Sequence, residues 1–278
     1  MFNIQITPVV KKILLINVIV WLITIFIPFL NLDYHLAMYD VSSEHFKPWQ
    51  FVTHIFMHAS TDFYGDIIIS HILMNSIGLI FIGPMVEREL GGKRFISYYL
   101  LTGFGAAAIH LAASRLYLNH LNVLLYEFSQ TPSRDGFLVL TDKLISRSAI
   151  IGDPQLNEWY RLVYNNLLPQ KINANVVEEA KKFLSLFVQK NADSKMVGAS
   201  GAIYGLIAAL GVMFPNTKFM LLFPPIPIKA KWLALFLGGY AFYQGIQFNP
   251  ADNVGHFAHL GGAVIGAILI FQWKRKGQ

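Results

Sequence analysis

The chain has 278 residues, of which 54% are hydrophobic and 14% charged, and its mean hydropathy is +0.46. A soluble domain carries about 25% charged residues, so this composition excludes an ordinary soluble protein and predicts a polytopic membrane protein. The net charge of +6 does not indicate nucleic-acid binding, because the basic residues fall at the ends of apolar runs. The absence of cysteine excludes disulfides and thiolate chemistry.

Apolar runs of nearly 20 residues, the length needed to cross about 30 Å of hydrocarbon, recur along the chain. We expect spans at residues 13–30, 67–83, 95–113, 197–214, 232–248 and 254–273. The first run has no small-residue cleavage site behind it, so we interpret it as a true span and not as a signal peptide. The apolar stretch 219–228 contains Pro224, Pro225 and Pro227, which predict a loop at the membrane interface.

Basic residues predict the orientation of these spans. The set of connections that includes both termini is rich in lysine and arginine, whereas the alternate short loops hold only Lys47 as a basic residue. The positive-inside rule therefore predicts that both termini are cytoplasmic. Ser200, at the start of the fourth span, then enters the membrane from the outer side.

Two outer connections are too long to be plain loops. Residues 31–66 contain apolar stretches too short to span, which predicts short interfacial helices. Residues 114–196 predict a helical subdomain that either packs on itself or rests on the membrane surface. The chain thus divides into spans 1–3 with the long first loop at 1–113, the insertion at 114–196, and spans 4–6 at 197–278.

The insertion carries two helix-start signals. Asp153 followed by Pro154 predicts an N-cap and first-turn proline, and Asn175 with Glu178 resembles a capping box before a second apolar stripe. We expect the aromatic side chains of these two helices to lie at the boundary between membrane and water, beside the outer leaflet. They are Trp159, Tyr160, Tyr164 and Phe187.

Ser200 is the candidate nucleophile. A lone serine in a membrane helix usually bonds its own helix backbone, but Gly198 and Gly201 leave the backbone around this one uncovered, so a substrate carbonyl could approach. Tyr204 lies one helical turn further on the same face, and Gly205 permits close packing of another helix.

His259 is the candidate base for this nucleophile. It stands with Gly262 and Gly266 at i, i+3 and i+7, which forms one stripe of a second apolar helix. Two glycine-lined helices could therefore meet with Ser200 facing His259. His256 is a second candidate, but we choose His259 because of its alignment with the glycines.

Polar residues inside the second span indicate a further part of the site. His71 and Asn75 stand at i and i+4, so they present an imidazole and a carboxamide side by side. Such a pair often forms a bond between helices, but beside a serine nucleophile it offers two donors for a developing oxyanion. Asp252 is the only acid between Ser200 and His259, so a Ser-His dyad is predicted, with Tyr204 packing on the imidazole.

Taken in order, these motifs resemble the rhomboid family of intramembrane serine proteases. They comprise His71-Ile72-Leu73-Met74-Asn75, Gly198 to Gly201 with Tyr204 and Gly205, and His259 to Gly262 with Gly266. The run Gly83 to Gly91 also resembles the family's second cytoplasmic-side turn.

The resemblance implies an all-α, six-transmembrane-helix bundle with a helical extracytoplasmic insertion between spans 3 and 4. Ser200 would act as nucleophile and His259 as general base and acid, while His71, Asn75 and the Ser200 amide would bind the oxyanion. No cofactor or metal would take part. The substrates would be single-pass transmembrane proteins in the lipid bilayer, and the protein would lie in a bacterial inner (plasma) membrane.

Three features depart from the family or leave alternatives open. Gln50 follows Trp49 where the family often has arginine, and residues 114–196 are far longer than a minimal connection. This insertion either influences which substrates enter or is merely tolerated. A non-catalytic membrane client-binding relative, and a membrane metalloenzyme using pairs such as His54 with His58, remain alternative functions.

Overall fold

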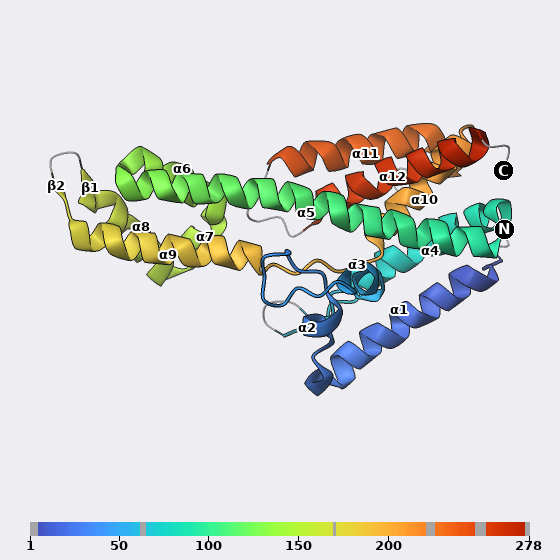
Figure 1. The fold of residues 1–278 in the computed structure, drawn as a ribbon, viewed down its shortest axis with the longest axis horizontal. Coiled ribbons are helices and arrows are strands. Elements are labelled where there is room, and N and C mark those ends of the chain that lie inside the picture. Colours follow the sequence, from blue (N-terminus) through green and yellow to red (C-terminus); the bar gives the residue numbers. More distant parts are fainter. Residues whose placement is uncertain (1–4, 62–64, 169–170, 221–225, 248–253, 276–278) are drawn as a thin grey trace. The chain divides into compact units, whose positions relative to one another are not determined.

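The computed structural model describes residues 5–61, 65–168, 171–220, 226–247 and 254–275, which are mostly helical (Figure 1). These residues form two compact units. The first comprises residues 1–111, 195–245 and 255–278, and the second comprises residues 112–194 with 246–254. The predicted segments 1–113 and 197–278 thus fall almost entirely in the first unit, and 114–196 almost entirely in the second.

The first unit is a bundle of long helices with short helical turns in its first loop. The long helices are α1 (Pro8–Phe26), α4 (Ser70–Leu90), the first part of α5 (Gly92–Gln130), α10 (Ser200–Met213), α11 (Ala230–Gln247) and α12 (His256–Arg275). The turns are η1 (Pro28–Leu30), α2 (Leu32–Leu36), α3 (Gln50–Thr53) and η2 (His54–Phe56). Short helices were thus correctly predicted in the loop 31–66, but several of its residues, including Met38, Ile55 and Met57, are fully buried.

Four helices in the described part of the chain, α1, α4, α5 and α12, are long and apolar enough to cross a membrane. The protein is therefore an integral membrane protein. Helix α10 is apolar but has only 14 residues, and α11 is not among the four, so the count of six spans stays a prediction.

Helix α5 does not end at Ala113, where the third span was predicted to end. It runs for 39 residues, to Gln130. At a rise of 1.5 Å per residue its length is about 58 Å, roughly twice the hydrocarbon thickness. The local sequence permits this continuation, because Ala106 to Gln130 contains neither glycine nor proline.

The run Gly83 to Gly91 is helical and not a turn, contrary to the resemblance. Helix α4 includes Pro84 and ends only at Gly91, whose φ of +73° terminates it. The buried Glu87 in this run binds the start of α1. Its carboxylate accepts the backbone N–H groups of Val9 at 3.0 Å and Val10 at 2.9 Å, and the Thr7 hydroxyl. A carboxylate on these free N–H groups also complements the positive end of the helix dipole.

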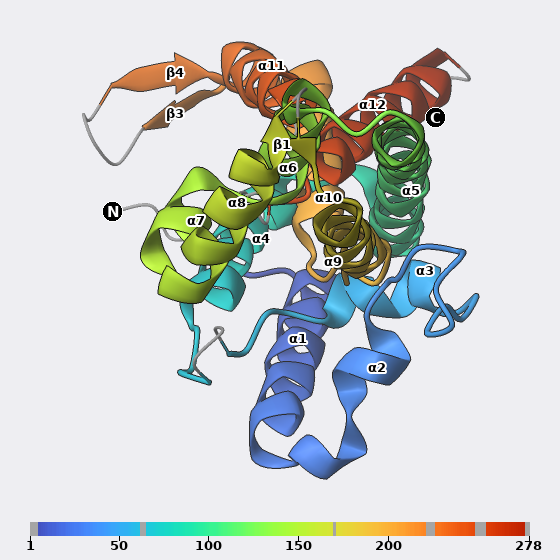
Figure 2. The same cartoon turned by 90° about the vertical axis from the view of Figure 1, so that its left-hand side faces the viewer.

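Both ends of the stretch predicted to be a loop at 219–228 lie in β-strands. Strands β3 (Lys218–Met220) and β4 (Pro227–Lys229) pair antiparallel, with Phe219 opposite Ile228, and β4 leads directly into α11 (Figure 2). Pro227 is tolerated in this two-stranded sheet, where each strand is an edge. Pro224 and Pro225 lie outside the described residues.

Close packing of α10 against α12 positions the residues that the sequence singled out. An alanine Cβ at position 262 would lie only 1.9 Å from the carbonyl oxygen of Gly201, and one at position 266 would lie 2.8 Å from the Cα of Gly205. Only glycine fits at such an approach. Tyr98 of α5 donates a hydrogen bond of 2.6 Å to the carbonyl of Gly205, which ties a third helix to this contact.

The second unit is a small helical subdomain with its own core. It contains the end of α5, α6 (Arg134–Leu144), α7 (Arg147–Gly152), α8 (Pro154–Asn166), the paired strands β1 (Leu167–Leu168) and β2 (Lys171–Ile172), and α9 (Ala174–Ala192). Its buried core includes Leu121, Phe128, Phe137, Leu140, Val163, Ala180 and Leu184.

One of the two predicted caps of this unit is correct. Asp153 caps α8 by accepting the N–H groups of Gln155 and Leu156, as predicted. For α9 the cap is Asn173 and not Asn175, because the Asn173 side chain already accepts the N–H groups that follow it, including that of Asn175 itself.

The aromatic side chains expected at the membrane boundary pack against the core of this unit and are partly buried there. The ring of Trp159 lies 4.1 Å from that of Phe183 and 5.8 Å from that of Phe137. Tyr160, Tyr164 and Phe187 also pack against the core. The subdomain therefore packs on itself, while its placement beside the outer leaflet stays a prediction.

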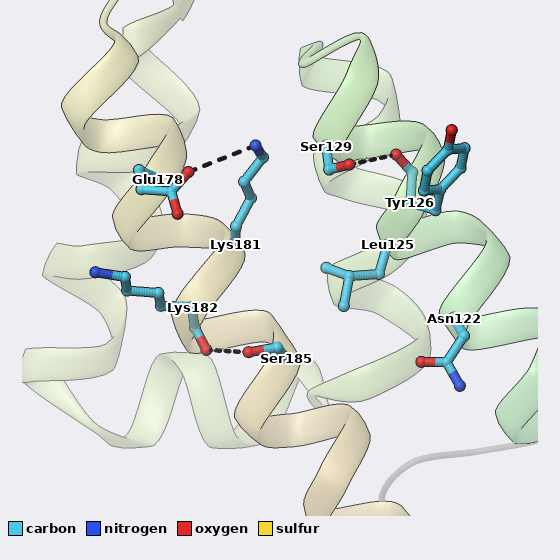
Figure 3. A pocket seen from close by; sticks show the side chains of 8 residues that line it. All are labelled: Asn122, Leu125, Tyr126, Ser129, Glu178, Lys181, Lys182 and Ser185. Atoms are coloured by element: carbon cyan, nitrogen blue, oxygen red, sulfur yellow. Dashed lines mark hydrogen bonds and ion pairs between the residues drawn. The ribbon is translucent and has the colours of Figure 1, made fainter.

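A cavity of about 360 Å³ lies between α5 and α9 in this unit (Figure 3). It is lined by Asn122, Leu125, Tyr126, Ser129, Glu178, Lys181, Lys182 and Ser185. An ion pair of 3.5 Å joins Lys181 to Glu178. None of the predicted site residues lines it.

Candidate active site

Ser200 and His259 lie at hydrogen-bond distance. Ser200 is the first residue of α10 and His259 lies in the first turn of α12. The Nε2 atom of His259 is 2.8 Å from the Oγ atom of Ser200. A serine hydroxyl bonded to an imidazole is the arrangement in which the ring can take the hydroxyl proton, which makes the oxygen a nucleophile.

Tyr204 holds the imidazole ring of His259 in place. The two rings are stacked, with centroids 4.3 Å apart and planes within 6° of parallel. The ring of His256 lies edge-on to His259 at 6.1 Å, and it also contacts Tyr240 at 6.3 Å. Of the two histidines considered as base, His259 is thus the one bonded to Ser200.

Gly198 lies between His71 and Ser200. Its φ is +124°, a conformation that other residues rarely adopt, and an added Cβ would meet the Nε2 atom of His71 at 2.8 Å and the Oγ atom of Ser200 at 3.8 Å. A side chain here would fill the space between the imidazole and the hydroxyl. The glycine therefore keeps this space open.

His71 and Asn75 lie side by side on α4, as the i, i+4 spacing requires. The Nδ2 atom of the buried Asn75 donates to the carbonyl of His71 at 2.9 Å, which leaves its second hydrogen for another acceptor. The Nδ1 atom of His71 accepts the backbone N–H of Ala59 at 3.1 Å.

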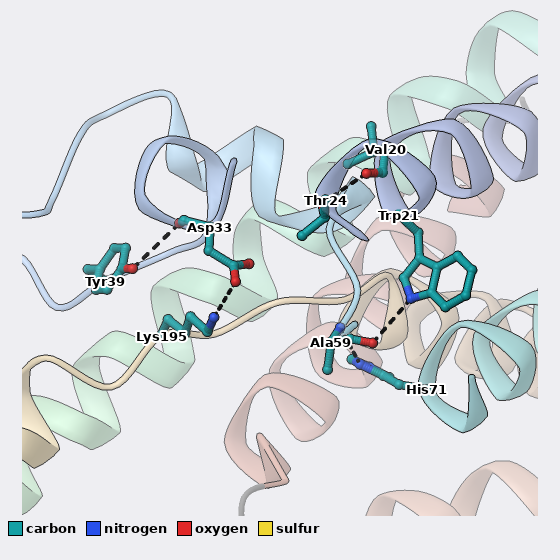
Figure 4. Close-up of polar contacts among 8 residues, drawn as sticks. All are labelled: Val20, Trp21, Thr24, Asp33, Tyr39, Ala59, His71 and Lys195. Atoms are coloured by element: carbon teal, nitrogen blue, oxygen red, sulfur yellow. Dashed lines mark hydrogen bonds and ion pairs between the residues drawn. The ribbon is translucent and has the colours of Figure 1, made fainter. Parts of the chain in front are cut away.

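The segment that precedes Ser200 is held by the first loop. Lys195 forms an ion pair with Asp33 (Figure 4), and Met196 exchanges two backbone hydrogen bonds with Met38, at 2.8 and 2.9 Å. Gly198 donates its N–H to the carbonyl of His54 at 3.0 Å. Sequence reasoning missed these contacts, and no local pattern signals them, because the partners are more than a hundred positions apart.

Gln50, which stands where the family often has arginine, organises this loop from inside. It is fully buried, and its Nε2 atom donates to the carbonyls of His45 at 3.0 Å and Tyr34 at 3.4 Å. Its Oε1 atom accepts the N–H of Lys47 at 3.0 Å. The side chain therefore bonds to the loop backbone and not to lipid.

His54 and His58 are buried in the same loop. The Nδ1 atom of His54 lies 2.7 Å from the carbonyl oxygen of Gln50, and the ring of His58 packs on that of His71. Burial lowers the pKa of both histidines from 6.5 to about 4, so both rings are neutral at neutral pH. Among the described residues, no three His, Cys, Asp or Glu side chains are grouped so that they could hold a metal ion.

The fold and the site together define a helical, membrane-integral protein with a serine and a histidine paired at the meeting point of two glycine-lined helices. The Rhomboid domain family matches this chain over residues 45–121 and 178–276, so the chain belongs to the rhomboid family. Residues 122–177, which lie in the second unit, fall outside the match.

Similar proteins carry the same family name. The chain is 23% identical over 245 residues to RHOMBOID-like protein 12, mitochondrial, of Arabidopsis thaliana, covering 88% of this chain and 52% of that protein. It is 24% identical over 237 residues to an uncharacterized mitochondrial rhomboid protein of Schizosaccharomyces pombe, covering 82% and 52%. Over 77 residues it is 32% identical to Rhomboid protein 1, mitochondrial, of Saccharomyces cerevisiae, covering 28% of this chain and 21% of that protein.

The chain thus spans about half the length of the first two relatives. All three are named as mitochondrial, so the comparisons give no support to the expected bacterial inner membrane.

Proposed function

We propose that this protein is an intramembrane serine endopeptidase that hydrolyses peptide bonds in or near the transmembrane segments of membrane proteins. The observation that carries the proposal is the 2.8 Å contact between His259 Nε2 and Ser200 Oγ, with Tyr204 stacked on the imidazole. Membership of the rhomboid family supports the same reaction class.

In the proposed reaction His259 Nε2 takes the proton of Ser200 as Oγ attacks the substrate carbonyl carbon. The resulting tetrahedral intermediate carries the negative charge on the former carbonyl oxygen. It collapses when His259 returns the proton to the leaving amine, and an acyl ester remains on Ser200. A water molecule, deprotonated by His259, then attacks the ester and releases the carboxylic acid and the free serine.

The developing oxyanion would be stabilised from the side of α4 and from the start of α10. The backbone N–H of Ser200, at the positive end of α10, is one proposed donor, and His71 and Asn75 are the others. The position of Gly198 between His71 and Ser200 supports this role, because the oxyanion must sit between these two side chains.

The proposed substrates are single-pass transmembrane proteins whose spanning helix is easily unwound. A protease needs an extended backbone, which a lipid-embedded helix does not present. The charge distribution supports placing Ser200 toward the side opposite the basic connections, with the second unit on that same side. The dyad requires no metal and no cofactor.

Labelling with a serine-directed fluorophosphonate tests the proposal. The full-length protein in detergent micelles should be labelled at Ser200, and it should cleave a model single-pass substrate, whereas Ser200→Ala should do neither. Absence of labelling and cleavage in a folded wild-type protein would favour the non-catalytic client-binding alternative. Cleavage abolished by a chelator, without labelling, would favour the metalloenzyme.

A further inference from the structure

The orientation of His71 depends on residues outside the proposed catalytic set. His71 must present an N–H to the oxyanion, and a neutral imidazole carries a proton on only one of its nitrogens. The residues that contact its ring therefore decide which nitrogen serves as the donor. Two of them are consecutive in the first loop.

Ala59 selects the tautomer of His71. Its backbone N–H donates to Nδ1 at 3.1 Å, so Nδ1 is the unprotonated nitrogen and a neutral His71 carries its proton on Nε2. Nε2 is the atom that faces Gly198, beyond which lies Ser200 Oγ. The Ala59 amide therefore directs an N–H into the space where the oxyanion would form.

His58 packs on the same ring. Its ring centroid lies 5.3 Å from that of His71, with the planes 61° apart, an edge-to-face contact. The side chain is buried, and its ring nitrogens form no hydrogen bond with His71. The backbone of Phe56 lies near the ring and partly offsets the effect of burial on its pKa. Because burial keeps its pKa near 4, the ring is uncharged and does not repel His71. Its contact with His71 is therefore a packing contact between two rings and not a hydrogen bond.

Trp21 holds the Ala59 peptide from the first helix. Its Nε1 atom donates to the carbonyl of Ala59 at 3.4 Å, on the opposite side of that residue from the bond to His71 (Figure 4). A chain of two hydrogen bonds thus links α1 to the imidazole of His71. The bond from Trp21 is long for an N–H···O bond, so its contribution should be small.

We propose that His58 and Ala59 form a two-sided support that positions His71 as an Nε2–H donor, with Trp21 anchoring that support to α1. These are positioning residues, because they act through His71 and not on the substrate. The inference rests on the proposed function, since it assigns His71 to the oxyanion.

The test measures kcat and KM for a model transmembrane substrate with full-length variants. His58→Ala should lower kcat by roughly 10-fold to 100-fold with KM nearly unchanged, because a misplaced oxyanion donor weakens transition-state binding alone. His58→Phe, which keeps a ring, should recover most of the activity. Trp21→Phe should lower kcat by a few-fold. Thr24→Val is the matched control, since within the described part of the chain the Thr24 hydroxyl bonds to the Val20 carbonyl of its own helix at 2.9 Å, and this variant should match the wild type.

A double-mutant comparison separates positioning from general structural support. In a His71→Ala background, neither His58→Ala nor Trp21→Phe should reduce kcat further, because both act only through the missing side chain. Additive losses would overturn the proposal, as would full activity of both single variants. Inactivity of His58→Phe with wild-type thermal stability would also overturn it, because the ring nitrogens would then be required. Failure of the wild type to be labelled at Ser200 would instead refute the proposed function.

Discussion

Replacing Gly262 with alanine should uncouple the two residues of the proposed dyad. The added Cβ would lie 1.9 Å from the carbonyl oxygen of Gly201, whereas ordinary contacts begin at 3.4 Å. The helices α10 and α12 must therefore separate locally by about 1.5 Å, the difference between these distances. Because His259 lies one turn from position 262, its 2.8 Å contact with Ser200 should be lost. A misplacement of about 1 Å can cost on the order of 100-fold in rate.

The assay compares Gly262→Ala with Gly239→Ala in detergent micelles. Gly239 lies in α11 with no atom within 4 Å of an added Cβ, so the same substitution there meets no obstacle. Gly262→Ala should lower both cleavage and Ser200 labelling by about 100-fold, and overpacking should destabilise the protein by about 1–3 kcal/mol. Gly239→Ala should keep wild-type activity. Wild-type turnover and thermal stability of Gly262→Ala would refute the argument that this glycine contact sets the site.

The remaining predictions concern the dyad, a buried carboxylate and the buried histidines. Ser200→Ala and His259→Ala should each abolish cleavage, and the double variant should be no worse, because the losses caused by residues that act as one unit do not add. Substantial activity in either single variant would contradict the dyad. Glu87→Ala should lower the free energy of unfolding by about 1–3 kcal/mol, because it leaves N–H groups at the start of α1 without a partner. Labelling of Ser200 in the folded fraction should change little. An unchanged melting temperature would argue against this cap. His54 and His58 have folded-state pKa values of about 4, below the 6.5 of the unfolded chain, so the stability from their neutral forms is complete above pH 6.5 and lost as the pH falls toward 4. That loss is at most ~3.4 kcal/mol for each, from 1.36 kcal/mol per pKa unit over the 2.5 units between 6.5 and 4, and a melting temperature equal at pH 7.5 and pH 4 would contradict it.

The sequence alone was sufficient for the class of protein and for the local features of the site. Hydropathy located α1, α4, α10, α11 and α12 to within several residues. A helix in lipid forms its backbone hydrogen bonds internally and exposes apolar side chains, so its sequence is one continuous apolar run. The spacing of His259, Gly262 and Gly266 predicted the face of α12 that meets α10, because positions i, i+3 and i+7 share one side of any helix. Asp153 was recognised as a cap because capping involves only adjacent residues.

Tertiary structure decided everything that depends on distant partners. Glu87 looked like a charged residue of a turn, and only packing shows that it caps α1, nearly eighty positions earlier. The extension of α5 to Gln130 follows from the second unit, whose core includes Leu121 and Phe128 of that helix. The support of His71 by Ala59 and Trp21 leaves no pattern in the sequence, because a backbone amide can bind any acceptor that the fold brings to it. Local spacing thus determines which side chains share a helix face, while the packing of the whole chain determines which residues that face contacts.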